Sequence, residues 1–252
     1  MRLVSFNILN GRAPDATQVD VRTFAAAIAA LDADVLALQE VDRNQPRSAG
    51  ADLTAVAAEA MGAPEHRFVA ALHGSPGATW SAATGEEQPD SAGYRIALLS
   101  RHPVAAWQEI RLPAAPVQVP MRFRGRVLPT LVRDEPRVAV AAQVEAPSGS
   151  LTVVNTHLSF VRWWNGRQLR RLVRSVSPLP RPLLLCGDLN MDTERAVRLT
   201  GLTPTGHHAT FPWNRPVEQL DHVLADPPLA ARTSVCRMPI SDHLAFVVDL
   251  PD

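Results

Sequence analysis

The sequence predicts a mixed α/β fold in which two β-sheets pack face to face and helices cover their outer surfaces. Short apolar runs typical of buried strands, such as 35–38 and 183–186, recur along the chain. Between them lie stretches with helical spacing of apolar residues, such as 19–31, and turn signals typical of hairpins. No repeat and no linker-like stretch divides the chain, so residues 1–252 are expected to form a single domain.

The expected elements of the first half follow from apolar runs and from the residues that interrupt them. Gly62 and Pro64 end one helix, and the Asn10-Gly11 pair marks a turn after the first strand. We expect strands at 2–8, 34–38 and 94–99, helices at 19–31 and 52–61, a loop at 74–91, and a long loop or irregular hairpin at 113–133.

The second half is expected to begin with a hairpin whose two strands are joined across Pro147–Ser150. A buried strand then ends at the Gly187-Asp188 pair. We expect strands at 137–144, 151–155, 183–186, 219–224 and 244–250, helices at 167–176 and 193–199, and a loop at 207–216.

Composition excludes several classes of protein. Apolar residues make up 46% of 252 residues, enough for a large core, and 25 basic and 25 acidic residues give no net charge that would draw the chain onto nucleic acid or membrane. Cys186 and Cys236 are far apart in apolar stretches, which indicates reduced core residues rather than a disulfide framework or a zinc knuckle. With no signal sequence and no apolar run near the ~20 residues of a membrane span, a cytoplasmic location is expected.

Short polar strings follow six of the apolar runs and are the most informative feature of the chain. Each contributes a carboxylate, an amide or an imidazole where a buried strand would reach solvent. Such groups at converging strand ends can hold a hard divalent cation and activate water. The strings are Ser5-Phe6-Asn7, Leu38-Gln39-Glu40, Asn155-Thr156-His157, Gly187-Asp188-Leu189-Asn190, Leu220-Asp221-His222 and Ser241-Asp242-His243.

Glu40 is the strongest candidate metal ligand, since a carboxylate after the buried run Val35–Leu38 must be solvated or bind a cation. Asn7 has the matching neutral position after the first strand. Mg²⁺ usually takes one or two protein carboxylates and keeps several waters, so this sparse set is sufficient.

Asp188 and Asn190 lie two residues apart and would point to the same side of an extended segment. There they could orient an attacking water and a phosphoryl oxygen, or bind metal. The same string also fits ordinary Asp and Asn turn chemistry.

Asp242 and His243 form the second pair with catalytic potential. Asp242 is a candidate metal ligand or histidine orienter, and His243 a general base or a donor to transition-state oxygens. Asp221 could fix the tautomer of His243, and His157 could contact the scissile phosphate. Structural alternatives are a capping aspartate, a strand-end turn and packed histidines.

Other catalytic classes lack their motifs. The remaining histidines do not have the spacing of a zinc site, and the sequence contains neither a glycine-rich phosphate loop nor a serine nucleophile elbow. Nucleotide triphosphatases and α/β-hydrolases are therefore excluded.

Together and in this order, the six strings resemble the endonuclease/exonuclease/phosphatase superfamily, from Ser5 to His243. This superfamily includes deoxyribonucleases, abasic-site endonucleases, neutral sphingomyelinases and inositol polyphosphate 5-phosphatases. The resemblance implies a four-layer sandwich of two mostly antiparallel sheets flanked by helices. It also implies in-line attack of water on phosphorus with Mg²⁺, or alternatively Mn²⁺, as cofactor.

Site roles follow from the same resemblance, position by position. Catalytic roles are implied for His157 at the phosphate, Asp188 and Asn190 at the water, and His243 paired with Asp221; metal-site roles are implied for Asn7, Glu40 and Asp242. Whether Asp188 or His243 takes the proton stays open. Arg95 departs from the family pattern because it stands where a small residue is usual.

Two acid-free tracts bear on the substrate. One spans 146–187 and the other 110–132, and both could hold a polyanion through phosphate contacts or form solvated surface. Their arginines are Arg162, Arg167, Arg170, Arg171, Arg174, Arg181, Arg111, Arg122, Arg124 and Arg126.

The leading hypothesis is a Mg²⁺-dependent phosphodiesterase or nuclease. A phospholipid or sugar-phosphate esterase is the alternative, and a catalytically inactive binding protein comes third. Exposure of Trp163, Trp164, Phe123 and Met121 as one apolar rim would favour peripheral contact with lipid.

Overall fold

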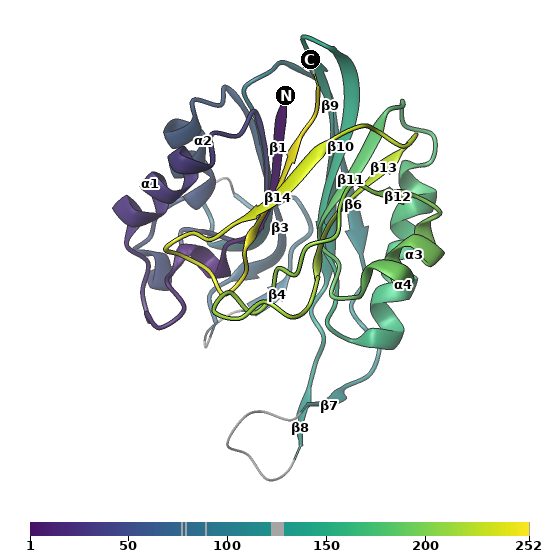
Figure 1. Cartoon of the computed structure of the whole chain (residues 1–252). Coiled ribbons are helices and arrows are strands. Elements are labelled where there is room, and N and C mark those ends of the chain that lie inside the picture. The colour runs from purple at the N-terminus through teal and green to yellow at the C-terminus, as the bar shows by residue number, and fades with distance from the viewer. Residues whose placement is uncertain (77, 79, 89, 122–128, 252) are drawn as a thin grey trace.

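Two β-sheets face each other across a shared core in the computed structural model, which describes residues 1–76, 78, 80–88, 90–121 and 129–251 (Figure 1). Within these residues, one sheet has seven strands in the order β14-β15-β1-β2-β5-β3-β4, and the other has six in the order β12-β13-β11-β10-β9-β6. Only β1 with β2 and β10 with β11 run parallel among these described pairs. The predicted sandwich of two mostly antiparallel sheets is therefore confirmed.

The strands of the seven-stranded sheet are β1 (Arg2–Asn7), β2 (Val35–Arg43), β3 (Glu65–Gly74), β4 (Trp80–Ala82), β5 (Gly93–Ser100), β14 (Arg232–Cys236) and β15 (Ala245–Asp249). Those of the six-stranded sheet are β6 (Val104–Leu112), β9 (Arg137–Ala146), β10 (Gly149–His157), β11 (Leu183–Asp188), β12 (Thr203–Pro204) and β13 (Asp221–Asp226). The helices are α1 (Val21–Leu31), α2 (Leu53–Met61), α3 (Arg162–Val176) and α4 (Thr193–Thr200), with 3₁₀ turns at Leu9–Gly11 and Pro46–Ser48.

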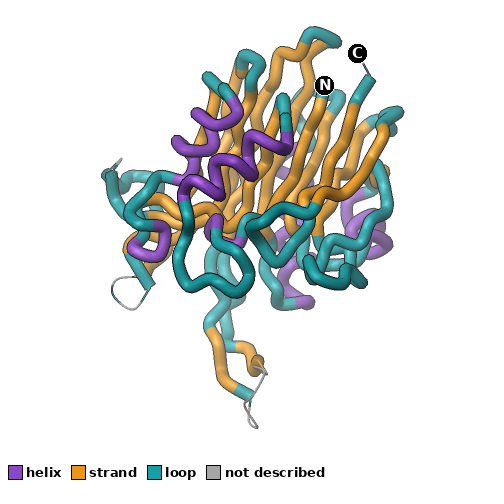
Figure 2. The backbone as a smooth tube through the Cα atoms, turned by 60° about the vertical axis from the view of Figure 1, so that its left-hand side comes forward, coloured by secondary structure: helices purple, strands orange, loops and turns teal. Residues whose placement is uncertain are grey.

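Helices cover the outer face of each sheet, which gives four layers (Figures 1 and 2). Phe24 and Ile28 of α1 pack on Leu36 and Leu38 of β2, and Leu169 and Leu172 of α3 pack on the six-stranded sheet. A third apolar cluster fills the space between the sheets. No described helix is long and apolar enough to cross a membrane.

Local sequence signals explain where α1 and α2 begin and end. Asp20 and Asp52 cap them by accepting hydrogen bonds from backbone N–H groups of the first turn. Gly62 ends α2 in the left-handed conformation, with φ of 65°, as predicted from its position. Helix α3 begins at Arg162, before the predicted residue 167, so Trp163 and Trp164 lie in its first turn.

Strands β3, β6, β12 and β14 were not predicted, and β4 lies in the segment expected to be a loop. Strands β4, β6 and β14 form sheet edges and are largely exposed, so they lack the continuous apolar run that reveals an interior strand. Cys186 and Cys236 are both free thiols, as expected.

A two-stranded arm projects from the sandwich between β6 and β9 (Figure 1). Its strands β7 (Val119–Met121) and β8 (Thr130–Val132) pair antiparallel, which bears out the irregular hairpin expected at 113–133. The expectations for Arg122, Phe123, Arg124 and Arg126 lie outside the described residues.

A buried amide pair links the two sheets beneath the site. Gln39 Nε2 donates to Asn155 Oδ1 at 2.8 Å, and Asn155 Nδ2 donates to the carbonyl oxygens of Leu38 and Ala97. Both side chains are completely buried, and these bonds replace water at every polar atom of the two amides except Gln39 Oε1, which has no partner. The pair fixes how β2 and β5 sit against β10.

Candidate functional site

Four predicted residues meet at one end of the sandwich because two pairs of parallel strands end there. Asn7 and Glu40 lie at and near the ends of β1 and β2, and His157 and Asp188 end β10 and β11. This end lies opposite the chain termini and is the end from which the β7–β8 arm projects (Figure 1). The site is thus divided between the two sheets.

Glu40 is directed by a β-bulge. The register of β2 against β5 shifts between Gln39 and Val41, and Glu40 adopts φ of 58°, a conformation unusual for a residue with a side chain. Asn7 Nδ2 donates to Glu40 Oε1 at 3.3 Å. Asn10 donates to the Glu40 carbonyl oxygen at 3.4 Å and so supports the bulge; its sequence signal indicated only a turn.

Asp188 occupies the centre of the site and is buried. Its Oδ2 accepts from Asn7 Nδ2 at 3.0 Å, and its Oδ1 accepts from the backbone N–H of Asn190 at 2.9 Å. Burial, and next the charge of Asp221, raise the pKa of Asp188 from 3.8 to about 7. A carboxylate with this pKa is suited to accept a proton near neutral pH.

Gly187 permits the close approach of strands that places Asp188. A side chain here would put Cβ 1.8 Å from the backbone oxygen of Thr156, and φ is 132°. Only glycine tolerates both conditions.

His243 and Asp221 form the predicted imidazole–carboxylate pair, with Nδ1 and Oδ2 2.8 Å apart. Burial lowers the pKa of His243, but the charges of Asp221 and Asp188 outweigh it and raise that pKa to about 10. The ring is therefore a cation at neutral pH, with Nε2 3.9 Å from Asp188 Oδ2. The Phe211 ring packs against it at 4.9 Å between centroids.

Ser241 holds the backbone before His243; it begins the string Ser241-Asp242-His243, but no role was predicted for it. Its hydroxyl donates to the carbonyl oxygen of Asn7 and accepts the backbone N–H of His243 at 3.0 Å. This contact joins the loop before β15 to the end of β1. The adjacent Asp242-His243 signal gave no indication of the role of the serine.

His157 and Asn190 complete the wall around Asp188. His157 Nε2 lies 3.3 Å from Asn190 Nδ2 and 3.5 Å from Asp188 Oδ2. Burial, together with the charges of Arg95 and His243, lowers the pKa of His157 well below its usual value, so its ring is neutral. Asn190 has φ of 50°, so residues 188–190 form a turn rather than an extended segment. The side chains of Asp188 and Asn190 nevertheless both face His157.

Asp242 is only partly buried and has unused acceptor capacity. Burial raises its pKa, and Glu40 raises it further by repulsion. In the part of the chain that the structure describes, no other residue donates a hydrogen bond to its carboxylate. Two acids that repel each other, of which Asp242 has no donor from another described residue and Glu40 accepts only from Asn7, fit a hard cation, and the metal-site role of Asn7, Glu40 and Asp242 stays a prediction.

A second group could also bind a divalent metal. Single ligand atoms of Asp188, Asp221 and His243 all lie within 4.8 Å of one another, and all three residues are buried. The Asp221–His243 hydrogen bond occupies Nδ1 and Oδ2, and leaves His243 Nε2 and the unpartnered Asp221 Oδ1 as the atoms through which these residues could bind a metal. The donor chemistry of both groups fits a divalent ion.

Arg95 is completely buried at the start of β5. Its Nη1 lies 3.3 Å from Glu135 Oε2, while Nε and Nη2 have no hydrogen-bond partner. An ion pair with Glu135 therefore accommodates the arginine at a position where the family usually has a small residue. The charge of Arg95 also helps to lower the pKa of His157.

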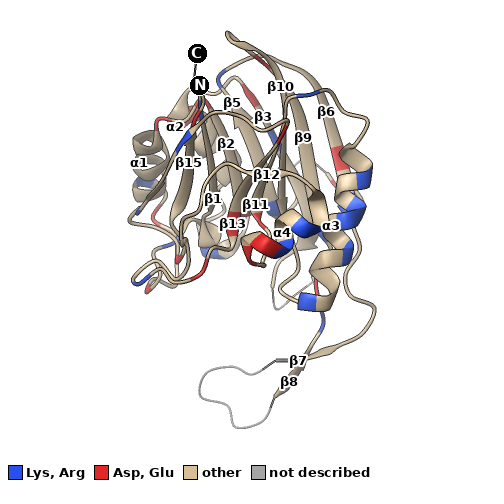
Figure 3. Cartoon of the chain, turned by 45° about the vertical axis from the view of Figure 1, so that its right-hand side comes forward, with Lys and Arg blue, Asp and Glu red and all other residues tan. Residues whose placement is uncertain are grey.

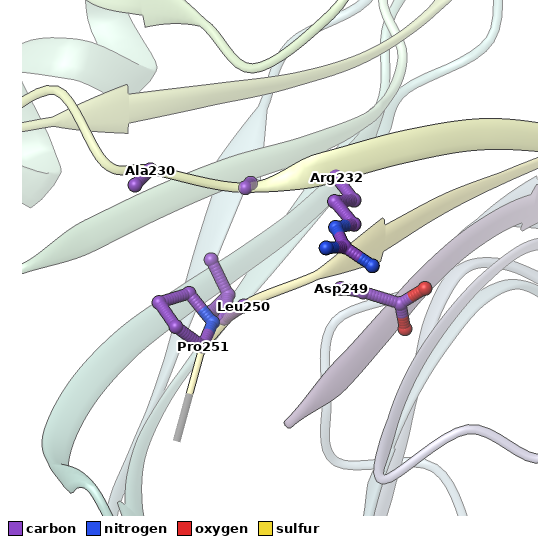
Figure 4. A pocket seen from close by; sticks show the side chains of 6 residues that line it. Ala230, Arg232, Asp249, Leu250 and Pro251 are labelled. Atoms are coloured by element: carbon purple, nitrogen blue, oxygen red, sulfur yellow. The ribbon is translucent and has the colours of Figure 1, made fainter.

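A cavity of about 460 Å³ lies at the opposite end of β1 and contains none of these residues (Figure 4). It is lined by Ala230, Ala231, Arg232, Asp249, Leu250 and Pro251. Asp249 forms an ion pair there with Arg2 at 2.8 Å. The cavity therefore shares neither its location nor its residues with the site around Asp188.

Fold and site together define a phosphoesterase of the α/β-sandwich class with a buried Asp and His group whose atoms could bind a divalent metal. The family model described as endonuclease/exonuclease/phosphatase matches residues 4–243, and the chain belongs to this family. The resemblance inferred from the six strings is thereby confirmed. Among curated proteins, none matches the sequence.

Solved structures show the same fold. An endonuclease/exonuclease/phosphatase from Beutenbergia cavernae shares 24% identity with a TM-score of 0.68, covering 99% of this chain and 71% of the other. The mannosyl-6-phosphatase Bt3783 of Bacteroides thetaiotaomicron shares 15% identity with a TM-score of 0.64 over 100% of both chains. The structure of SmcL shares 13% identity with a TM-score of 0.64, covering 100% of this chain and 99% of the other.

Proposed function

We propose that the protein is a Mg²⁺-dependent phosphodiesterase in which Asp188 activates water for in-line attack on phosphorus. The observation that carries this proposal is the buried Asp188 carboxylate, with its pKa raised to about 7, among two amides and two histidines. A base with this pKa is half ionised at neutral pH and can accept the proton of a water molecule.

Each neighbour of Asp188 has a distinct role in the proposal. Asn7 and the backbone N–H of Asn190 hold the carboxylate in place. His243 is cationic and donates to the oxygens on which negative charge develops, while Asp221 keeps its ring oriented. His157 and the Asn190 amide contact a non-bridging phosphate oxygen.

The assignment of the proton to Asp188 follows from the opposite charge states of the two candidates. The charges of Asp221 and Asp188 raise the pKa of His243 to about 10, which favours its protonated form at neutral pH, so we assign the role of base to Asp188. A divalent ion held by Asn7, Glu40 and Asp242 would neutralise phosphate charge and stabilise the leaving oxygen.

Hydrolysis of two chromogenic esters tests the proposal. The diester bis(p-nitrophenyl) phosphate and the monoester p-nitrophenyl phosphate are compared with Mg²⁺, with Mn²⁺ and with EDTA. We expect metal-dependent turnover of the diester, and a loss of about 10²- to 10⁴-fold in His243→Ala. His207→Ala is the matched control, since His207 is exposed and outside the site.

Two results would contradict this assignment. Equal rates in His243→Ala and wild type would remove His243 from the mechanism. Faster turnover of the monoester would instead favour a sugar-phosphate phosphatase, the activity named for the Bacteroides thetaiotaomicron structure.

A phospholipid diester is the second candidate substrate, and exposed apolar side chains on and near the arm favour it. Val117, Leu131 and Trp163 are 55%, 64% and 45% exposed. Trp164 donates its indole N–H to the carbonyl oxygen of Pro113 and so is anchored rather than free. Phe123 and the side chain of Met121, the other members of the expected rim, lie outside the described residues.

Sphingomyelin in vesicles tests this candidate. If it is the substrate, Leu131→Asp will reduce vesicle hydrolysis and leave hydrolysis of the soluble diester unchanged. Equal effects on both substrates would remove the arm from lipid binding.

A further inference from the structure

An arginine-lined pocket of about 260 Å³ lies where β3 and β4 approach β6, β9 and α3. Among the described residues that line it, none is acidic. The arginines come from three separate parts of the chain: Arg111 from β6, Arg137 from β9 and Arg171 from α3. The two acid-free tracts of the sequence supply Arg111 and Arg171, and the fold brings them together with Arg137.

The pocket is close to the proposed catalytic residues. Arg137 begins β9, whose neighbour β10 ends at His157, and Arg137 pairs with Leu112 at the end of β6. Neighbouring strands lie about 4.8 Å apart, so the backbone of Arg137 lies one strand to the side of the end of β10 at His157. One substrate can therefore span both places.

Arg137 is a buried cation with an unused donor. Its side chain is 3% exposed, and its Nε has no hydrogen-bond partner. The carboxylate of Asp134 lies 3.8 Å away but accepts instead from the backbone N–H of Ala115 and the hydroxyl of Ser159. Nε itself is enclosed, so an anion in the pocket would contact this guanidinium through its atoms that line the pocket and would balance its charge.

Arg111 and Arg171 add positive charge, and no described carboxylate forms an ion pair with either of them. Arg111 Nη1 donates to the carbonyl oxygens of Ala70 and Ala83, which fixes its guanidinium without cancelling its charge. Among the described side chains, no carboxylate lies within 4 Å of Arg111 or Arg171. The nearby acid Glu135 pairs with Arg95.

Helix α3 holds Arg171 in position. Trp164 Nε1 and Gln168 Nε2 both donate to the carbonyl oxygen of Pro113, which also lines the pocket. Arg171 lies one helical turn after Gln168 on a helix rich in basic residues (Figure 3).

We infer that this pocket binds a second phosphate group of the substrate whose scissile ester lies at His157 and Asp188. Guanidinium groups from three elements surround the volume, and guanidinium matches the geometry of phosphate oxygens. The inference rests on the proposed function and narrows it to esters that carry a further phosphate beside the one attacked.

Binding of inorganic phosphate in EDTA at low ionic strength tests the pocket without catalysis. Isothermal titration calorimetry compares the wild type with Arg171→Gln and with Arg170→Gln, a matched change at a neighbouring exposed position of α3 that does not line the pocket. We expect Arg171→Gln to weaken binding by about five- to tenfold and Arg170→Gln to leave it unchanged. Absence of binding, or equal effects of both variants, overturns the inference.

A pair of dinucleotides tests the link to catalysis. Thymidylyl-thymidine with a 5′-phosphate differs from the same dinucleotide without it only by the second phosphate. We expect the wild type with Mg²⁺ to have a higher kcat/KM for the phosphorylated form, and Arg171→Gln to reduce this preference several-fold while leaving turnover of the other form unchanged. No preference in the wild type means that the pocket does not serve the substrate.

The two experiments separate the two proposals. If phosphate binds through Arg171 but no ester is hydrolysed, the proposed function fails and the anion pocket stands. If diesters are hydrolysed but Arg171 affects neither binding nor preference, the proposed function stands and the pocket does not.

Discussion

Replacing Asp188 by Asn is expected to abolish catalysis yet stabilise the metal-free protein at alkaline pH. Asn has the shape of a protonated aspartic acid, so the variant resembles the neutral form of the site. Burial and Asp221 raise the pKa of Asp188 from 3.8 to about 7, so ionisation opposes folding. The difference of about 3 pH units corresponds to about 4 kcal/mol at 1.36 kcal/mol per unit.

The pH range of this effect follows from the direction of the shift. A folded-state pKa above the unfolded value means that folded Asp188 binds its proton more tightly. Its contribution to stability is therefore fully present below pH 3.8 and is lost as pH rises to about 7. Wild type and Asp188→Asn should have nearly equal stability at pH 4 and differ by up to about 4 kcal/mol in favour of the variant at pH 8.

Urea unfolding in EDTA, measured at intervals from pH 4 to pH 8, provides the assay. Asp15→Asn removes an exposed carboxylate and serves as the control for charge alone. Parallel stability curves for wild type and Asp188→Asn would refute the reasoning, because Asp188 would then titrate equally in the folded and unfolded states. Added Mg²⁺ should stabilise the wild type more than the variant.

Three further predictions concern the pair, the metal and the strand end. Asp221→Asn removes the charge that raises the pKa of His243, so kcat/KM should fall by about 10²- to 10⁴-fold. The alkaline limb of the pH–rate profile should also move to lower pH. If that limb does not move, the Asp221–His243 pair does not act in catalysis. Glu40→Gln should raise the Mg²⁺ concentration for half-maximal activity by at least about tenfold, whereas loss only on mutating Asp221 or His243 would favour the other metal group. Gly187→Ala should lower stability by about 3 kcal/mol or more in urea unfolding, since its Cβ meets the backbone of Thr156; soluble protein of wild-type stability would show that β10 and β11 can separate.

The interior strands and the polar residues at their ends could be predicted because both follow from local sequence. The apolar run of β2 is buried on both faces, and the string after it marks the point where it reaches the site. Strands β6 and β14 could not be predicted in this way, because an edge strand is held by backbone pairing and tolerates exposed polar side chains.

Tertiary geometry limited the prediction of the site. Asp188 and Asn190 were expected to face one way through an extended backbone, but the left-handed conformation at Asn190 produces that result through a turn. Ser241 and the bulge at Glu40 depend on contacts between segments distant in sequence, and no local pattern encodes them. The pairing of Asp221 with His243 was predictable because both strings carry the residues that such a pair requires.

The Gln39–Asn155 pair between the sheets has a consequence for how activity relates to folding. Neither half of the site is useful alone, since Glu40 belongs to one sheet and Asp188 to the other. The amides demand one alignment, because sliding one sheet past the other would leave several buried donors and acceptors without partners. A partly folded form that keeps both sheets but loses their alignment should therefore have no turnover. Activity would then report directly on whether the two sheets are packed as in the native protein.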